Sequence, residues 1–308
     1  MGLISWLVLQ GLTVGLLWFL IASGLSLIFG LMNVLNFAHG ALYMLGTYGA
    51  LTLYMATGNF VLALVGGTLL GAVLGALIEL LAIRPLYGRQ LFQVLMTMGL
   101  ILVFDEAVEA IWGPYPLPFA VPAALQGTFT VFDRPFPVYR LFIIAVGFTV
   151  WLLVHLFLTR SRLGIIVRAG VEDREMVQAL GIDIRKVFTG VFALGGALAA
   201  LGGAVAGPFE GAHPTLASEN LLPAFIVVVV GGLGSFTGSL LAAILVGLTQ
   251  AFVGYYAPQF ALAVNIALMA VVLVLRPEGL LGRQGGGARC CVCANRRAAG
   301  LEWPCRPL

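Results

Sequence analysis

The chain has no charged side chain before Glu79, and its first basic residue is Arg84. A water-soluble domain contains about 25% charged residues, so a charge-free stretch of this length is not compatible with folding in water. The whole composition agrees, because 61% of the 308 residues are apolar and 9% are charged. The apolar runs are continuous and do not alternate with polar residues, which argues against a β-barrel. We therefore predict an all-α protein that crosses a membrane many times.

The same composition excludes an ordinary soluble enzyme, a disordered chain and a secreted disulfide scaffold. A cleavable signal peptide is not expected, because no basic residue precedes the first apolar run. The net charge of +3 gives no reason to expect a nucleic-acid partner. The four cysteines lie together near the end of the chain, so no disulfide framework holds the apolar part. They are Cys290, Cys291, Cys293 and Cys305.

A helix needs roughly 20 apolar residues to cross the hydrocarbon core of a bilayer. Eight apolar segments meet this requirement, and the seventh is too long for one straight helix. A glycine-rich run at 231–238 interrupts it, so we predict eight or nine transmembrane helices with broken segments. The predicted spans are 5–29, 41–57, 61–83, 91–111, 141–158, 187–207, 221–252 and 260–275.

Basic residues in short loops indicate the cytoplasmic side. Arg84 and Arg89 place one loop there, and the basic loop at about 160–186 is placed there too. Three predicted crossings precede the cytoplasmic Arg84, so the N-terminus is expected on the outside. Arg276 and Arg283 favour a cytoplasmic C-terminal end, which requires nine crossings. We expect a membrane domain over 1–283 and a disordered Cys/Arg-rich tail over 284–308.

Two breaks between apolar segments carry the polar residues of a predicted translocation pathway. The first contains Asn33, Asn36, His39 and Gly40, and polar groups at membrane depth survive only when buried in protein or lining a cavity. Asn36 is expected to cap the following helix, whose N-terminus would attract a carboxylate. The alternative is that Asn36 is only a cap and His39 an interfacial residue.

The second break contains Gly234, Ser235 and Thr237, and the two hydroxyls are candidate caps for the helix that follows. Paired glycine-interrupted segments in the two halves of a chain indicate a central pathway. Close helix packing through small residues explains this run equally well.

A short amphipathic helix is predicted within the cytoplasmic loop. Glu172 or Asp173 is a candidate N-cap, and Gly181 a candidate C-terminal stop. Met176, Val177 and Leu180 form an apolar stripe that suits docking into the groove of a partner protein. The alternative is a solvated helix that rests on lipid headgroups.

Four stretches together resemble the permease subunits of high-affinity branched-chain amino acid ABC importers, of the LivH type. The first is the 33–40 run with its continuation at 43–46. The others are 173–175 with 179–182, the glycine run at 231–235, and Arg-Pro-Glu-Gly-Leu-Leu-Gly at 276–282. The resemblance covers about residues 5–283.

The resemblance implies a type II ABC importer-like permease fold in a bacterial inner membrane. It also implies a second permease subunit of LivM type, two cytoplasmic ATPase subunits and a periplasmic solute-binding protein. No cofactor is expected on this chain, which has no P-loop and one lysine, Lys186; the partner subunits would use ATP and magnesium. The residues implied in coupling to the ATPases are Glu172, Asp173, Glu175, Ala179 and Gly181.

The predicted function is ATP-powered import of leucine, isoleucine and valine. Urea, short-chain amides or other amino acids are alternative solutes within the same family. An ion-coupled transporter or channel that uses Asp105, Glu106 or His39 is the alternative of another class, although charge within the spans is scarce. No converging catalytic or metal-ligating groups can be assembled from the sequence, so an intramembrane enzyme is not expected.

Overall fold

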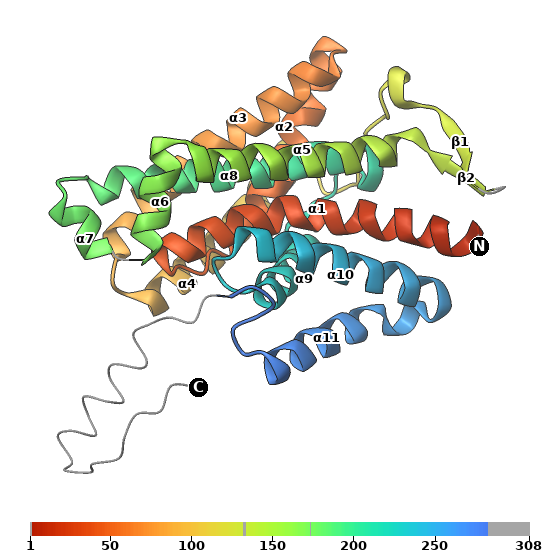
Figure 1. Ribbon diagram of the computed structural model, residues 1–308. Coiled ribbons are helices and arrows are strands. Elements are labelled where there is room, and N and C mark those ends of the chain that lie inside the picture. The colour runs from red at the N-terminus through yellow and green to blue at the C-terminus, as the bar shows by residue number, and fades with distance from the viewer. Residues whose placement is uncertain (1, 132–133, 173, 283–308) are drawn as a thin grey trace.

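The computed structural model describes residues 2–131, 134–172 and 174–282. Nearly all regular structure in these residues is helical (Figure 1). The tail at 284–308, which the sequence predicts to be disordered, lies outside them. The longer helices are α1 (Gly2–Met32), α2 (His39–Thr57), α3 (Phe60–Ile78), α4 (Gln90–Trp112), α5 (Val138–Arg160), α6 (Arg162–Glu172), α8 (Ile184–Glu210), α9 (Leu216–Gly231), α10 (Phe236–Tyr256) and α11 (Ala261–Leu275).

The shorter elements lie in the connections. Two strands pair as an antiparallel hairpin next to α5, which the sequence did not predict, because its Pro-rich loop has no strand pattern. The short helical turns and strands are η1 (Glu79–Ile83), η2 (Arg84–Leu86), η3 (Ala123–Leu125), α7 (Arg174–Ala179), η4 (Pro258–Phe260), β1 (Thr128–Val131) and β2 (Arg134–Pro137).

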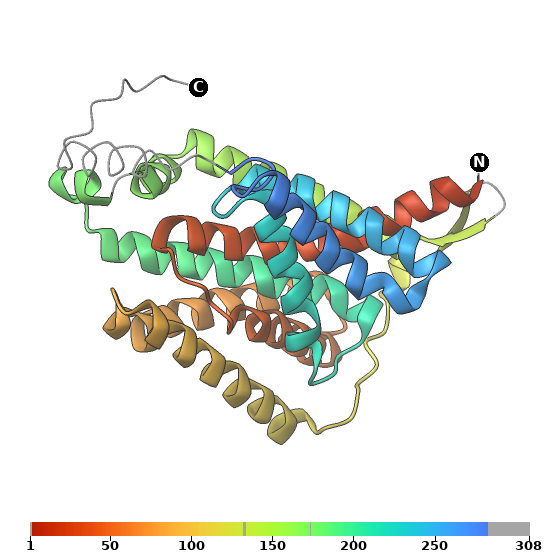
Figure 2. The same ribbon diagram turned by 90° about the horizontal axis from the view of Figure 1, so that it is seen from below.

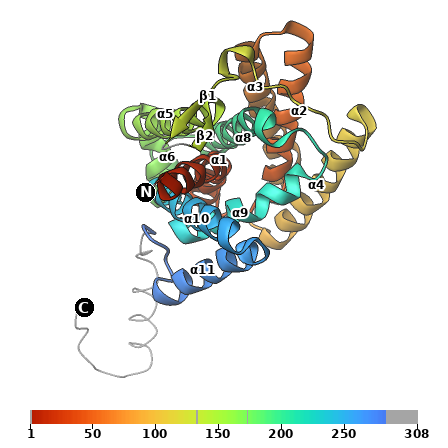
Figure 3. The same cartoon turned by 90° about the vertical axis from the view of Figure 1, so that its right-hand side faces the viewer.

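Helix α1 is the centre of the bundle, with α5, α8 and α10 around it (Figure 3). Its uncharged sequence follows from this position, since most of its side chains from Leu16 to Ile28 are buried by other helices. Glycines allow the close approach: Gly15 faces Gly247 on α10, and Gly24 faces Gly195 on α8. Small residues let helix backbones come together in membranes.

The contacts between α1 and α10 show that these helices are antiparallel. A Cβ built on Gly30 would lie 2.8 Å from the Cα of Gly234, and one built on Gly11 would lie 2.8 Å from the Cα of Leu248. Helix α10 therefore begins at the face of the bundle where α1 ends. Asn33 and Tyr87 line one cavity at this face, so the Arg84–Arg89 region belongs to it.

The end of the described chain returns to the same face. The amides of Leu280 and Leu281 donate to the carbonyls of Val230 and Gly231 at 2.8 and 3.2 Å. Arg276 therefore lies on the same side as Arg84, and the positive-inside rule makes that side cytoplasmic. This arrangement agrees with nine crossings.

Seven helices within the described residues are long and apolar enough to cross a membrane. They are α1, α3 with its continuation to Leu86, α4, α5, α8, α10 and the η4–α11 segment. Helix α9 is shorter, with 16 residues, and is inclined across the bundle (Figure 2). Helix α2 is less apolar because most of its residues from His39 to Leu51 are buried among helices and do not face lipid. With α2 and α9 the seven become nine helices in the described part of the chain, which roughly fits the predicted eight or nine.

Helix α3 does not end as a regular helix. It continues as a π-helical turn that begins at Glu79, and then as a 3₁₀ turn that contains Pro85. Proline lacks the amide hydrogen that a continuing helix needs, and π-helical turns are rare and frequently lie at functional sites. The turn carries Glu79 into the interior at the cytoplasmic face.

Candidate functional site

The first break in the apolar sequence is the segment 33–38 between α1 and α2. Asn33 begins it with φ +54°, and it is the sole non-glycine residue with positive φ among the residues that the structure describes. Asn36 and His39 are both fully buried. The Oδ1 and Nδ2 atoms of Asn36 and the Nδ1 atom of His39 have no hydrogen-bond partner, whereas Nε2 of His39 lies 3.1 Å from the carbonyl oxygen of Ile21. Buried polar atoms without a partner are costly, and polar groups at membrane depth are candidates for functional positions.

The predicted capping role of Asn36 is wrong. The N-cap of α2 is Ala38, which makes no side-chain cap hydrogen bond. The segment turns by a backbone hydrogen bond instead, from the amide of His39 to the carbonyl of Asn36 at 3.3 Å. The side chain of Asn36 therefore does not stabilise the start of α2.

Gly40 is a packing residue in this structure, because a side chain there would overlap the carbonyl of Ala217. It lets the start of α2 touch the start of α9. Phe37 holds the same segment against α9, with its ring centroid 5.1 Å from that of Phe225.

The second break connects α9 to α10. Gly232 and Gly234 have φ +99° and +83°, and Ser235 accepts a hydrogen bond from the amide of Gly238 at 3.2 Å. The predicted cap by Ser235 is confirmed, whereas the predicted cap by Thr237 is wrong, because Thr237 is already the second residue of α10. Since Gly234 packs on Gly30, the two breaks lie together at the cytoplasmic face. The closeness of the backbones also shows that these glycines serve packing.

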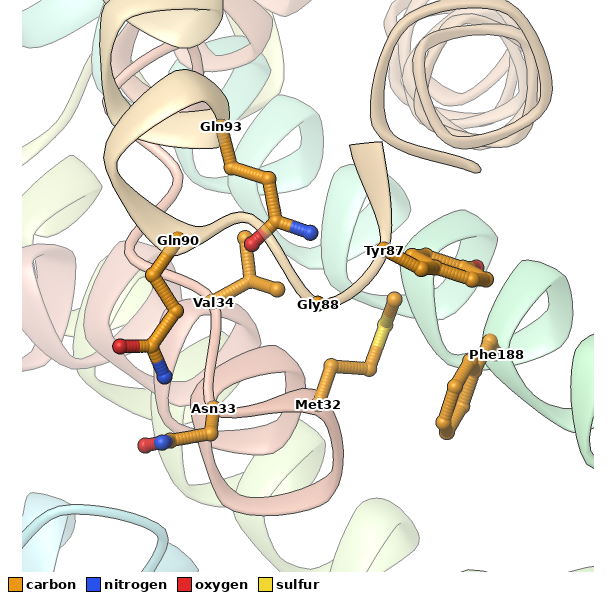
Figure 4. Close-up of a pocket in the computed structure, with 8 residues that line it drawn as sticks. All are labelled: Met32, Asn33, Val34, Tyr87, Gly88, Gln90, Gln93 and Phe188. Carbon is orange, nitrogen blue, oxygen red and sulfur yellow. The ribbon is translucent and has the colours of Figure 1, made fainter. Parts of the chain in front are cut away.

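A cavity of about 210 Å³ opens beside the first break, between the end of α1, the turn before α4, and α8 (Figure 4). In this view the amides of Gln90 and Gln93 extend from α4 toward the 33–34 segment. Met32 points toward the rings of Tyr87 and Phe188. Its eight lining residues are Met32, Asn33, Val34, Tyr87, Gly88, Gln90, Gln93 and Phe188.

The carboxyl group of Glu79 contacts one lining residue of this cavity, Tyr87. Glu79 is fully buried, and it accepts hydrogen bonds from the hydroxyls of Tyr87 and, at 2.6 Å, of Thr189 on α8. Burial and this carboxyl raise the pKa of Tyr87, so its hydroxyl stays protonated and donates to Glu79. The π-helical turn, the cavity wall and α8 are therefore joined through one side chain.

A second polar network joins four helices in the outer half of the bundle. Glu210 at the end of α8 accepts from Tyr43 of α2 at 2.9 Å and from Asn220 of α9 at 3.2 Å. Asn220 in turn accepts from the indole of Trp18 on α1 at 3.3 Å. None of these four residues was predicted from the sequence as part of a site. The one sequence feature that could have indicated this network is Glu210, a single acidic residue at the end of an apolar span. Such residues are too common for one of them to identify a site.

The predicted coupling segment forms a short helix, α7, at the cytoplasmic end. Gly181 follows it with φ +80°, and its amide donates to the carbonyl of Gln178 at 2.9 Å, which confirms the predicted C-terminal stop. Ala179 is the last residue of α7 and is exposed. Asp173 lies outside the described residues; Glu172 ends α6, and Glu175 is the second residue of α7.

The predicted apolar stripe on α7 is divided between two faces. Val177 is buried, whereas the side chains of Met176 and Leu180 are 59% and 72% exposed. Two large apolar side chains are therefore exposed at the cytoplasmic end, where either a docked partner or the lipid headgroups of the alternative interpretation would cover them.

Comparison with known proteins identifies the family. Residues 7–275 match the family model described as branched-chain amino acid transport system / permease component. The chain belongs to this family. It is therefore a transport permease subunit and a multi-pass membrane protein, with the mostly helical permease fold that the sequence resemblance implies.

Individual members of the permease family align with most of this chain. BraD of Pseudomonas aeruginosa is 32% identical and LivH of Escherichia coli 30% identical, each over 291 residues, which is 89% of this chain and 94% of the relative. LivM of Escherichia coli is 25% identical over 296 residues, 87% of this chain and 68% of the relative. All three are named as permease proteins of high-affinity branched-chain amino acid transport systems.

The hydrogen bond from Thr189 to the buried carboxyl of Glu79 should contribute to the stability of the folded permease. Replacing Thr189 with Val keeps the shape of the side chain but removes the hydroxyl that donates to Glu79, and should destabilise the protein by about 1–2 kcal/mol. The matched control is Thr68→Val on α3, since the hydroxyl of Thr68 bonds only the carbonyl of Leu64 in its own helix. Thermal unfolding of the purified permease should show a lower midpoint for Thr189→Val alone. Equal midpoints for the two variants would show that the carboxyl does not depend on α8.

Proposed function

We propose that this permease moves leucine, isoleucine and valine across the bacterial inner membrane toward the cytoplasm. The observation that carries the proposal is the full-length similarity to permeases named for branched-chain amino acids, at 30–32% identity. The scarcity of charge inside the bundle supports a neutral or zwitterionic solute, because a net-charged solute would need fixed counter-charges along its path. The chain does no chemistry of its own in this function.

The energy comes from other subunits in this proposal. Two cytoplasmic ATPase subunits bind ATP with magnesium and engage the helix α7, with Glu172, Asp173, Glu175, Ala179 and Gly181 as the coupling segment. A second permease of LivM type completes the pathway, which is supported by the presence of LivH and LivM among the relatives from one organism. A periplasmic binding protein delivers the solute to the outer loops.

The route through this chain follows the two breaks. Asn33, Asn36, His39 and Gly40 form one side, and Gly234, Ser235 and Thr237 the other. Asn36 and His39 are fully enclosed in this structure, so their unpartnered atoms would meet solute only after the helices separate. ATP binding and hydrolysis would open and close this part of the bundle, which gives alternating access to the two sides.

The substrate assignment is tested by reconstituting the permease with the second permease, the ATPase subunits and the binding protein that are encoded beside it. Uptake of labelled leucine should be inhibited by unlabelled isoleucine and valine, and should be unaffected by equal concentrations of urea or acetamide. Inhibition by urea or acetamide, with no inhibition by the branched-chain amino acids, would contradict the assignment and leave the permease function in place.

A further inference from the structure

The cavity beside the first break has one buried wall and one open edge. Met32, Val34, Gln93 and Phe188 are buried, whereas Asn33, Gly88 and Gln90 are exposed. Its opening therefore lies at the cytoplasmic face, next to the Arg84–Arg89 turn. The volume of about 210 Å³ equals roughly seven water molecules at about 30 Å³ each. That is space for a small metabolite, and is below the range of about 300–1,000 Å³ that drug-sized ligands occupy.

The lining has two chemical characters. Gln90, Gln93 and Asn33 supply neutral amides, which can both donate and accept hydrogen bonds. Gln93 is 3% exposed and makes no side-chain hydrogen bond in the part of the chain that the structure describes. Its amide atoms are not among the fully enclosed polar atoms that lack a partner, so they open to the cavity, where water or a ligand can satisfy them.

The rest of the wall is apolar. Met32, Val34, Tyr87 and Phe188 offer aliphatic and aromatic surface, and none of the eight lining residues is charged. Amides match both the ammonium and the carboxylate of a zwitterion, and the apolar wall matches an aliphatic side chain. A solute with net charge would find no counter-charge in the lining.

We propose that this cavity is a cytoplasmic binding site for the transported amino acid, occupied on its way out of the permease. Gln93 and Gln90 bind its ammonium and carboxylate groups, and Met32, Val34 and Phe188 surround its branched side chain. This inference rests on the proposed function, since it identifies where the transported solute binds before it is released to the cytoplasm.

The cavity adjoins both the first break and the buried carboxyl group of Glu79. The segment that forms its edge, Asn33 and Val34, leads within two residues to the buried Asn36, which places the cavity at the cytoplasmic end of the proposed route. Its back wall at Tyr87 is fixed to α8 through Glu79 and Thr189. Movement of α8 relative to α3 would therefore change the shape of the site.

The site is tested by thiol labelling of the complete transport assembly in nanodiscs, without nucleotide. The variant Gln93→Cys places a thiol in the cavity wall, and peptide mass spectrometry separates its modification from that of the four native cysteines beyond residue 289. Leucine is added at ten times the dissociation constant measured for the same cysteine variant, because the substitution itself removes an amide from the site. About one site in eleven is then free, so labelling at 93 should slow about tenfold. Glutamate at the same concentration should not slow it.

Two further variants complete the experiment. Gln126→Cys is the matched control, because Gln126 is exposed on the outer loop at the opposite face, and leucine should not change its labelling. Gln90→Cys on the exposed edge repeats the test if Gln93→Cys does not yield an assembled transporter. Each cysteine variant is compared with the wild-type assembly for leucine uptake.

The outcomes separate the two proposals. If the wild-type assembly imports leucine but leucine protects neither Gln93→Cys nor Gln90→Cys, the cavity site is wrong and the proposed function stands. If the assembly does not import leucine, and instead a different imported solute protects Gln93→Cys, the substrate is wrong and the site stands. Equal protection of Gln126→Cys would show a global effect of leucine and would overturn the site.

Discussion

Replacing Gly203 with Val should prevent this permease from forming a stable bundle. Gly203 lies on α8 where it crosses α2, and a Cβ there would overlap the backbone carbonyl of Tyr43 and lie 2.8 Å from Oγ1 of Thr47. A backbone carbonyl cannot rotate away as a flexible side chain can, so the helices would have to separate. Overpacking typically costs about 1–3 kcal/mol and occasionally more, and we expect the upper end here because the obstacle is backbone. The separation would also break the hydrogen bond from Tyr43 to Glu210.

The same helix provides the control for this prediction. Gly190 is also on α8, but a Cβ built there has no neighbouring atom within 4 Å. Gly190→Val should therefore give wild-type amounts of folded protein and a similar unfolding midpoint. The measurement is the monodisperse yield after extraction, followed by thermal unfolding. Wild-type yield and midpoint for Gly203→Val would contradict the packing of α2 on α8.

Replacing Leu180 with Asp should abolish ATP-driven uptake without unfolding the permease. Leu180 is 72% exposed at the end of α7, so a charge there has little effect on the internal packing. If an ATPase subunit buries this side chain, the substitution removes an apolar anchor and buries a charge. Losses of about 2 kcal/mol or more are typical of such anchor residues, and correspond to a roughly thirtyfold weaker association.

Gln178→Asp serves as the comparison, because Gln178 is exposed on the same helix and carries no apolar surface. The two variants are compared for co-purification of the ATPase subunits and for uptake. Leu180→Asp should lose both, whereas Gln178→Asp should keep both. If Leu180→Asp retained both and instead weakened binding of the permease to lipid vesicles, α7 would be a helix that rests on headgroups.

The sequence predicted the parts of the fold that depend on local hydrophobicity. The apolar runs and the glycine break at 231–238 correspond to helices and to the α9–α10 turn, because each signal is contained in a few neighbouring residues. Hydropathy describes α2 less well, since His39, Tyr43 and Tyr48 face other helices and a buried helix needs no uniformly apolar surface.

The polar contacts of the site could not be predicted in this way. Thr189 and Glu79 are 110 positions apart, and Trp18 and Asn220 are 202 positions apart. No local pattern joins such pairs, and each residue alone has several ordinary roles. The error at Asn36 has a similar cause: its spacing before a helix suits a cap, but the structure directs its side chain into the interior, where it makes no hydrogen bond.

The central claim is that this chain is a pathway driven by ATPase subunits that bind at its cytoplasmic face. The most direct measurement is solute uptake into proteoliposomes that contain the permeases with or without the ATPase subunits, at fixed ATP and in the presence of a proton uncoupler. We predict uptake only when ATPase subunits and ATP are both present, with no effect of the uncoupler. Uptake that persists without the ATPase subunits, or that stops with the uncoupler while ATP is held constant, would contradict the claim.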